Sequence, residues 1–150
     1  MRRAARALVI DNLDRVLILK AREDETKSSF YYLPGGGLKS GENLKQAAIR
    51  ELFEETGITL FSVGDEIYSE KIEFVFKGVK RIQENHVFCV FLDNVPSIKF
   101  PDETLSEVAE IESALWVSLK ELVEMKEKGF EIYPIELPKI VETCFKTRSL

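Results

Sequence analysis

Residues 36–58 read GGLKSGENLKQAAIRELFEETGI, and the interpretation of the whole chain begins from this stretch. Within it, Glu51, Glu54 and Glu55 stand at positions i, i+3 and i+4. In a helix, residues at this spacing share one face, and like charges there repel one another by a few tenths of a kcal/mol per pair. A bound cation would remove that repulsion. Because carboxylate oxygens are hard ligands, the pattern favours Mg²⁺ or Mn²⁺ over zinc or copper.

The residues around these glutamates resemble the signature of the Nudix hydrolases, G-x5-E-x7-R-E-U-x-E-E-x-G-U, in which U is a bulky apolar residue. The matching positions are Gly36, Glu42, Arg50, Glu51, Leu52, Glu54, Glu55, Gly57 and Ile58. If each residue type occurs at roughly 7%, the seven fixed identities coincide by chance on the order of once in 10⁸ starting points. A solvated acidic helix face would explain the glutamates, but it does not explain the glycines and the arginine at their fixed spacings.

The resemblance implies a hydrolase that cleaves a diphosphate (pyrophosphate) bond in a nucleoside diphosphate linked to another moiety. It implies Glu51, Glu54 and Glu55 as catalytic carboxylates and as ligands of Mg²⁺ or Mn²⁺, with the Gly35 carbonyl as a further ligand. A glutamate bound directly to the metal is a poor base, because the cation lowers its pKa. Family members often recruit another glutamate from the loop before the late tryptophan-containing strand, where Glu110 is the first candidate. The alternatives are Glu107, Glu112 and, more weakly, Glu84.

Other residues of the stretch are expected to support the site. Arg50 is offset by one residue from the carboxylate face, and Glu42 lies about two helical turns earlier. We therefore expect an Arg50–Glu42 pair that points away from the metal and fixes the glycine loop against the helix. The alternative is a surface ion pair worth ~0–1 kcal/mol. Gly36 lies in the loop that approaches the site, and Gly57 is a natural helix stop.

The helix itself is expected over residues 42–56, with Ser40 as its N-cap. Its small residues would let it lie close to a sheet, and this packing would turn the carboxylates outward into a cleft. The inward face is expected to comprise Leu44, Ala47, Ala48, Leu52 and Ile49.

Apolar runs bounded by turn residues predict strands on both sides of this helix. The predicted strands cover residues 5–10, 15–20, 30–33, 58–63, 67–76, 82–92 and 115–117, with turns at 12–14, 64–65 and 77–78 and a loop over 93–112. Ser118 and Glu121 form a capping box for a helix over 119–128 that Gly129 ends. A last amphipathic helix follows Pro138 and runs to about residue 146. This order, together with the resemblance, predicts an α+β Nudix fold, a mixed β-sheet in an α/β/α sandwich.

The composition is that of an ordinary globular chain, expected to form a single domain over residues 1–150. Net charge of −5 argues against a general nucleic-acid partner. Cys89 and Cys144 lack a metal-binding spacing, and we interpret them as reduced cytosolic thiols. The N-terminus lacks the pattern of a signal peptide, and the longest uninterrupted apolar run, residues 87–92, is too short to cross a membrane. We expect a cytoplasmic protein, a monomer or homodimer.

The exact substrate stays open. The proline common in ADP-ribose-selective members some sixteen residues past the signature is absent, since no proline occurs between Pro34 and Pro96. The downstream pattern of NADH-selective members is absent too. Oxidised nucleotides, dinucleoside polyphosphates and nucleotide sugars all remain candidates. The aromatic residues that could stack a base, although strand aromatics are usually core, are Tyr31, Tyr32, Phe74, Phe76 and Phe88.

Two other functions are possible on this fold. A non-catalytic nucleotide-sensing module is one alternative, but such modules commonly lose the acids of the signature, and this chain keeps them all. A prenyl diphosphate isomerase is the other, but it would need a catalytic cysteine before the signature, whereas Cys89 follows it. His86, the only histidine, is expected to be a packed or surface residue rather than a catalyst.

Overall fold

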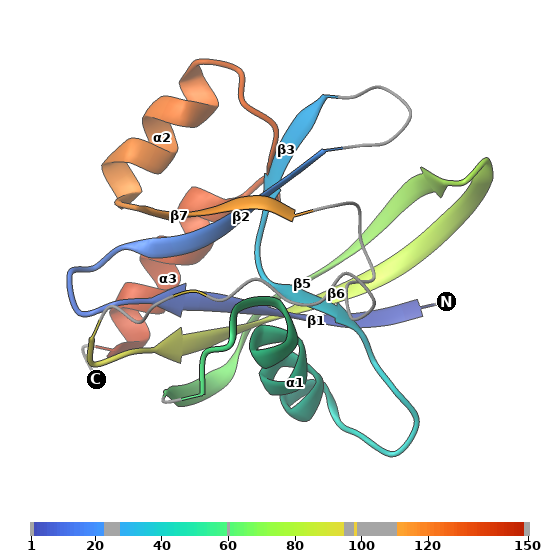
Figure 1. The fold of residues 1–150 in the computed structure, drawn as a ribbon, viewed down its shortest axis with the longest axis horizontal. Helices are drawn as coiled ribbons and strands as arrows, with labels where there is room; N and C mark the ends of the chain where they lie inside the picture. The colour runs from blue at the N-terminus through green and yellow to red at the C-terminus, as the bar shows by residue number, and fades with distance from the viewer. Residues whose placement is uncertain (1, 23–27, 60, 95–97, 99–110, 149–150) are drawn as a thin grey trace.

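The computed structural model describes residues 2–22, 28–59, 61–94, 98 and 111–148 (Figure 1). The strands are β1 (Arg2–Ile10), β2 (Val16–Arg22), β3 (Ser29–Tyr32), β4 (Gly35–Gly37), β5 (Ser62–Phe76), β6 (Val79–Phe91), β7 (Ile111–Val117) and β8 (Ile132–Tyr133). The helices are α1 (Leu44–Thr56), α2 (Leu119–Glu127) and α3 (Leu137–Arg148).

The strands form one mixed sheet in the order β5-β6-β1-β2-β3-β8, with β4 added beside β1 and β7 beside β2. β1 runs parallel to β6 and antiparallel to β4. The hairpin of β1 and β2 pairs only at Ile10 and Val16, after which the two strands diverge and each takes another partner. The sheet therefore splits into two halves (Figure 1), and β4 brings the glycine run alongside β1.

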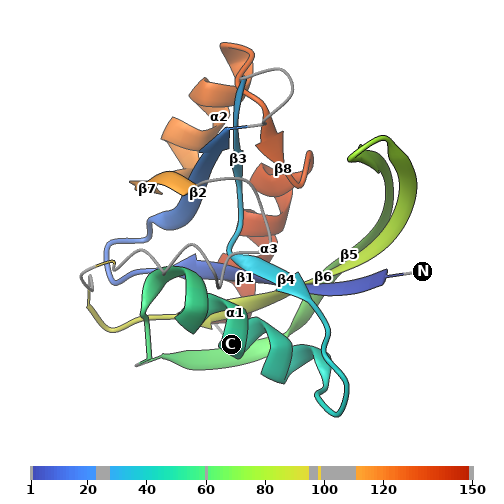
Figure 2. The same cartoon turned by 45° about the vertical axis from the view of Figure 1, so that its right-hand side comes forward.

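Helices cover both faces of the sheet (Figure 2). Alternate residues of β1 point to opposite faces: Ala5, Ala7 and Val9 lie toward α1, and Leu8 and Ile10 lie toward α2 and α3, all fully buried. The second face is completed by Leu122, Leu137, Ile140, Val141 and Cys144. The expectation of a mixed sheet in an α/β/α sandwich is confirmed.

Most local signals are confirmed, with differences in the strands: β7 begins at Ile111, within the predicted loop over 93–112, and the short strand β8 was not predicted. Ser118 caps α2 in a capping box with Glu121, and Lys77 and Gly78 turn the β5–β6 hairpin with positive φ angles of 51° and 77°. However, residues 35–37 form a strand instead of a loop, because they pair with β1. The strand predicted over 58–63 begins only at Ser62 and continues through the predicted turn at 64–65, where the register shifts against β6.

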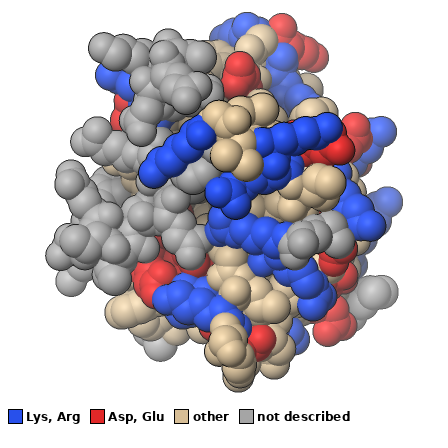
Figure 3. Space-filling view, turned by 90° about the vertical axis from the view of Figure 1, so that its right-hand side faces the viewer, with Lys and Arg blue, Asp and Glu red and all other residues tan. Residues whose placement is uncertain are grey.

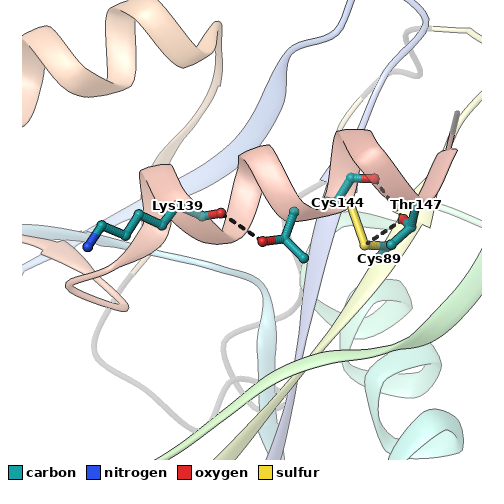
Figure 4. Close-up of a disulfide and its surroundings, with 5 residues drawn as sticks. Cys89, Lys139, Cys144 and Thr147 are labelled. Atoms are coloured by element: carbon teal, nitrogen blue, oxygen red, sulfur yellow. Dashed lines mark hydrogen bonds between the residues drawn. A yellow bond between two sulfur atoms is a disulfide. The ribbon is translucent and has the colours of Figure 1, made fainter.

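The two cysteines are joined in a disulfide, so the interpretation of two reduced thiols is wrong for this structure. Cys89 of β6 and Cys144 of α3 lie 55 residues apart in sequence, with Cα atoms 6.1 Å apart (Figure 4). Both side chains belong to the core between the sheet and α3. Sequence spacing alone could not show this, because the sheet and the last helix bring the two residues together.

Among the described residues, no helix is long and apolar enough to cross a membrane.

Candidate active site

Helix α1 begins at Leu44, two residues later than expected, and its N-cap is Asn43 instead of Ser40. The Asn43 side chain accepts a hydrogen bond from the backbone N–H of Gln46, and the Gln46 side chain accepts one from the backbone N–H of Asn43, each 2.8 Å long. This reciprocal pair satisfies two helix-end donors at once, which Ser40 cannot do from its position. At the other end Gly57 adopts the left-handed conformation, with φ 77°, as predicted.

The packing of α1 places its glutamates differently from the expectation of an outward-facing row. Ala47, Ala48 and Leu52 are buried as predicted, Leu44 is half-buried, and Ile49 is exposed, so its assignment to the inward face is wrong. Two carboxylates of the acidic face are buried as well. These are Glu51 and Glu55, each 2% exposed, whereas the Glu54 side chain is 18% exposed.

The glycine strand β4 covers these carboxylates at a distance that no larger residue would permit. A Cβ added at Gly36 would lie 2.5 Å from Glu51 Oε1, and one at Gly35 would lie 2.2 Å from the Ala5 carbonyl oxygen. Both distances are shorter than real side chains allow, and Gly35 also has φ 156°. Gly35 and Gly36 are therefore required so that β4 can lie between β1 and the acidic face of α1.

Glu55 is held under β4 as a buried carboxyl group. The Gly35 N–H donates to Glu55 Oε1 at 2.7 Å, and the Tyr32 hydroxyl donates to Oε2 at 3.5 Å. Burial raises the pKa of Glu55 to about 8, although Arg6 and the Gly35 N–H act in the opposite direction. Burial also raises the pKa of Tyr32, with Glu55 adding to the effect. Without a bound metal ion, this raised pKa favours the protonated form of the Glu55 carboxyl at neutral pH.

Arg50 makes the predicted pair with Glu42 and also contacts the acidic face. Its Nη2 and Nε donate to the two carboxylate oxygens of Glu42 at 2.7 and 3.1 Å, and this bond lowers the pKa of Glu42. Nη2 also donates to the Gly37 carbonyl at 2.9 Å. In addition, Nη1 donates to Glu51 at 2.8 Å and to Glu54 at 3.2 Å, so the expectation that Arg50 points away from this face is wrong. The guanidinium joins the loop, the strand and the helix.

Sequence reasoning did not identify Arg6 as a site residue. From β1, its Nη1 donates to the Gly35 carbonyl at 3.0 Å and to the Leu33 carbonyl at 3.3 Å. The guanidinium carbon lies 6.0 Å from the centre of the Tyr32 ring, and its charge opposes the rise in the pKa of Glu55. The available signal was a charged residue that interrupts the apolar run of residues 4–10.

The residues of this site fit a hard divalent cation by the chemistry of their donors. Glu51, Glu54, Glu55 and the Gly35 carbonyl offer only oxygen. In the described part of the chain no group of three acidic, histidine or cysteine side chains is already arranged as a metal site. Instead, the positive Nη1 of Arg50 lies between Glu51 and Glu54, which marks the space between these carboxylates as suited to a cation.

Of the other candidate glutamates, the two that the structure describes have partners elsewhere. Glu107 and Glu110 lie outside the described residues. Glu112 forms ion pairs with Arg22 at 2.8 Å and Lys20 at 3.8 Å. Glu84 accepts from His86 Nε2 at 2.6 Å, and His86 Nδ1 lies 2.5 Å from Glu66. His86 is thus a packed residue between two carboxylates, as expected. The aromatic residues that lie in the core are Tyr31, Tyr32 and Phe88.

Comparisons with known proteins agree with this geometry. The family model of the NUDIX domain matches residues 1–136. The RNA pyrophosphohydrolase of Brucella ovis is 38% identical over 52 residues, which cover 35% of this chain and 29% of that protein. The putative mutator protein MutT4 of Mycobacterium tuberculosis is 36% identical over 129 residues, which cover 79% of this chain and 47% of that protein. The chain therefore spans less than half the length of these curated relatives.

Among solved structures, an Ap4A hydrolase from C. elegans in a binary complex superposes with a TM-score of 0.71. The match covers 99% of this chain and 98% of that one, at 19% sequence identity. At this identity the likeness establishes the fold, which is the one that the described strands and helices form.

Proposed function

This chain belongs to the NUDIX family, and from that premise we propose that it is a metal-dependent hydrolase that cleaves a pyrophosphate bond in a nucleoside diphosphate linked to another moiety. The observation that carries the proposal is the position of Glu51 and Glu55, two carboxyl groups that are almost completely buried beside a glycine strand. Burial of two acids in one place is costly unless a cation neutralises them. Diphosphate hydrolysis needs that same cation.

We assign Glu51, Glu54 and Glu55 to the cation, Mg²⁺ or Mn²⁺, with the Gly35 carbonyl as a further ligand. When bound, the cation would offset the charge of the diphosphate and lower the pKa of a coordinated water. The Gly35 N–H and the Tyr32 hydroxyl hold Glu55 in place for this role. Glu54 is the most accessible of the three carboxylates, so it can change its partner from Arg50 to the cation with the least rearrangement.

Two arginines organise the site in different ways. Arg50 is bonded to Glu42, to the Gly37 carbonyl and to the acidic face, so it fixes the position of β4 over the helix. Arg6 reaches the Gly35 carbonyl from the other side of the glycine strand. An arginine there can bind a phosphate oxygen of the substrate while the carboxylates hold the cation. Glu110 remains a proposed additional ligand or base.

The relatives favour nucleotide substrates without selecting one. An RNA pyrophosphohydrolase, a mutator protein and an Ap4A hydrolase are similar to this chain. We propose that the substrate of this chain contains a nucleoside and a pyrophosphate bond, as the names of the RNA pyrophosphohydrolase and the Ap4A hydrolase imply for theirs.

We further propose a single domain over residues 1–150, because one core cluster joins residues from Leu8 to Cys144. A cytoplasmic location is proposed from the substrate class alone. Disulfides are rare in that compartment, so counting the free thiols of the protein isolated without reductant from the cytoplasm tests the location and the cysteine pair together.

The test is an assay of phosphate and nucleotide release from a panel that includes Ap4A, ADP-ribose, nucleoside triphosphates and a 5′-triphosphorylated RNA, with Mg²⁺ or with EDTA. We expect turnover of at least one compound with Mg²⁺ and none in EDTA. Tight binding of a panel member without turnover would instead identify the non-catalytic sensing module.

A further inference from the structure

Two amide side chains occupy an unusual position on β6, away from the carboxylates. Gln83 and Asn85 are only 4% and 7% exposed, on the strand face that is continued by Val87 and Cys89 of the core. Buried amides are uncommon unless they are hydrogen-bonded. These two bond to each other, with Gln83 Nε2 donating to Asn85 Oδ1 at 2.7 Å.

This bond uses only part of the hydrogen-bonding capacity of the pair. An amide side chain has two N–H donors and an acceptor oxygen, so Gln83 Oε1 can still accept a hydrogen bond and Asn85 Nδ2 can still donate one. In the described part of the chain these two side chains make no other hydrogen bond. No buried side-chain nitrogen or oxygen there lacks a partner, so the remaining amide atoms reach solvent. The pair therefore presents an acceptor and a donor side by side to solvent.

The strand register places this pair in line with the glycine strand. Ala4 of β1 pairs with Asn85 on one side and with Gly37 on the other. Because neighbouring strands lie 4.7–4.9 Å apart, Asn85 is about 10 Å from Gly37 along the sheet. Gln83 is opposite Arg2 in the same way. The amides thus lie two strands away from the edge that contacts the proposed cation ligands.

Arginines lie between the amides and the glycine strand. Arg2 and Arg6 flank Ala4 on the same face of β1. The Arg2 guanidinium lies over Gly37, since a Cβ added there would be 2.8 Å from Arg2 Nε, and Arg6 bonds to the Gly35 carbonyl. Figure 3 views the molecule from the side where β1 begins, and Lys and Arg side chains form a band across it. This surface suits the phosphates of a nucleotide.

We propose that Gln83 and Asn85 recognise the nucleobase of the substrate, with the phosphates lying over Arg2 and Arg6 toward the carboxylates. This inference rests on the proposed function and adds to it the residues that determine base specificity. A base edge that carries a hydrogen-bond donor next to an acceptor matches the outward Oε1 of Gln83 and Nδ2 of Asn85, and the four bases differ in the order and position of these groups on their edges. A base that cannot pair with these atoms leaves amide groups desolvated and unpaired, which lowers its affinity.

The test measures binding, so that it does not depend on turnover. The dissociation constants of ATP, GTP, CTP, UTP and tripolyphosphate are measured by calorimetry with Ca²⁺ in place of Mg²⁺. Asn85→Asp keeps the acceptor for Gln83 Nε2 and exchanges only the outward donor for an acceptor. Asn85→Leu removes the amide at similar size. Asn12→Asp, in the exposed turn between β1 and β2, is the matched control.

We expect the wild type to bind one nucleotide at least about tenfold more tightly than the weakest of the four. Asn85→Asp should change which base is preferred. In Asn85→Leu the dissociation constants of the four nucleotides should lie within about threefold of one another. Asn12→Asp should keep the wild-type ratios. The four nucleotides carry the same charge, so a general charge effect cancels in these ratios. Tripolyphosphate has no base, so its dissociation constant for Asn85→Leu should lie within about twofold of that for the wild type.

Unchanged ratios in both Asn85 variants, or no base preference in the wild type, would overturn the inference even if the protein hydrolyses pyrophosphate bonds. Loss of tripolyphosphate binding in Asn85→Leu, with the ratios intact, would assign a structural role to the amides and overturn it too. Base ratios that respond as expected in a protein without any turnover would support the inference and reject the hydrolase.

Discussion

Glu55 offers the most informative single substitution. Its ionised carboxylate is proposed to bind the cation, and without a bound metal ion that buried charge destabilises the folded protein. Glu55→Gln keeps an oxygen for the Gly35 N–H bond and removes the ionisable group. In wild type, the folded state raises the pKa of Glu55 from 4.5 to about 8. Between these values the folded chain keeps a proton that the unfolded chain has lost, so stability must fall as pH rises.

The size of this effect follows from the pKa. Each pH unit in the window costs the folded state about 1.4 kcal/mol, so the free energy of unfolding should fall by on the order of 4 kcal/mol between pH 5 and pH 8. Glu55→Gln should lack this slope and so be the more stable protein at pH 8 in EDTA. With Mg²⁺ at 100 times its dissociation constant, the wild type should regain about 2.7 kcal/mol and the variant much less.

The assay is urea unfolding of both proteins at pH 5, 6, 7 and 8, with EDTA and with Mg²⁺, followed by hydrolysis rates on the same preparations. We expect kcat of Glu55→Gln to fall by at least ~10²-fold, the scale for loss of a preorganised charge. If the free energy of unfolding changed equally with pH for the two proteins in EDTA, the reasoning would be refuted. Such a result would show that the Glu55 carboxyl is already ionised without a bound metal ion. A variant less stable than the wild type at pH 8 would refute it as well.

Three further predictions concern residues near and far from the site. Glu54→Gln should lower kcat by at least ~10²-fold without changing the melting temperature in EDTA, and near wild-type turnover at saturating Mg²⁺ would reject its assignment. Arg50→Ala should lower the free energy of unfolding by about 2–3 kcal/mol because it removes the guanidinium that bonds to Glu42, Glu51 and Glu54. Glu42→Gln should lower it less, and the double variant should lose less than the sum of the two single losses; strict additivity would contradict the shared interaction. Cys144→Ser should cost up to about 4 kcal/mol of stability, because it removes a link across 55 residues. It should leave kcat unchanged, since α3 covers the face of the sheet opposite α1. A fall in kcat of the folded variant would show that the two faces are coupled.

The local part of the site was predictable from sequence, because its information lies within one stretch. The i, i+3, i+4 spacing places the three glutamates on one face, and the Glu42–Arg50 spacing predicts their pair, which the structure contains. Even the error at the helix start is local. Ser40 and Asn43 are both good capping residues, and only Asn43 has a glutamine three positions later that completes the box.

What the sequence could not indicate depends on contacts between distant residues. Periodicity shows that Glu51 and Glu55 share a face, but their burial results from β4 pairing with β1, which hydrophobic patterning does not predict for three glycines. Arg6 is 29 residues from the Gly35 carbonyl to which it donates. Gln83 and Asn85 resemble ordinary polar positions of an alternating strand until the sheet order places them beside Arg2 and Ala4.

The central claim is that the acidic face of α1 binds the divalent cation that drives pyrophosphate hydrolysis. The most direct test titrates Mn²⁺ into the wild type and Glu54→Gln, and follows bound Mn²⁺ by electron paramagnetic resonance and turnover of the best substrate in the same samples. We predict that binding and turnover rise together in the wild type, with no turnover in EDTA, and that both are lost in Glu54→Gln. Turnover in EDTA, or Mn²⁺ binding that is as tight in Glu54→Gln as in the wild type, would contradict the claim.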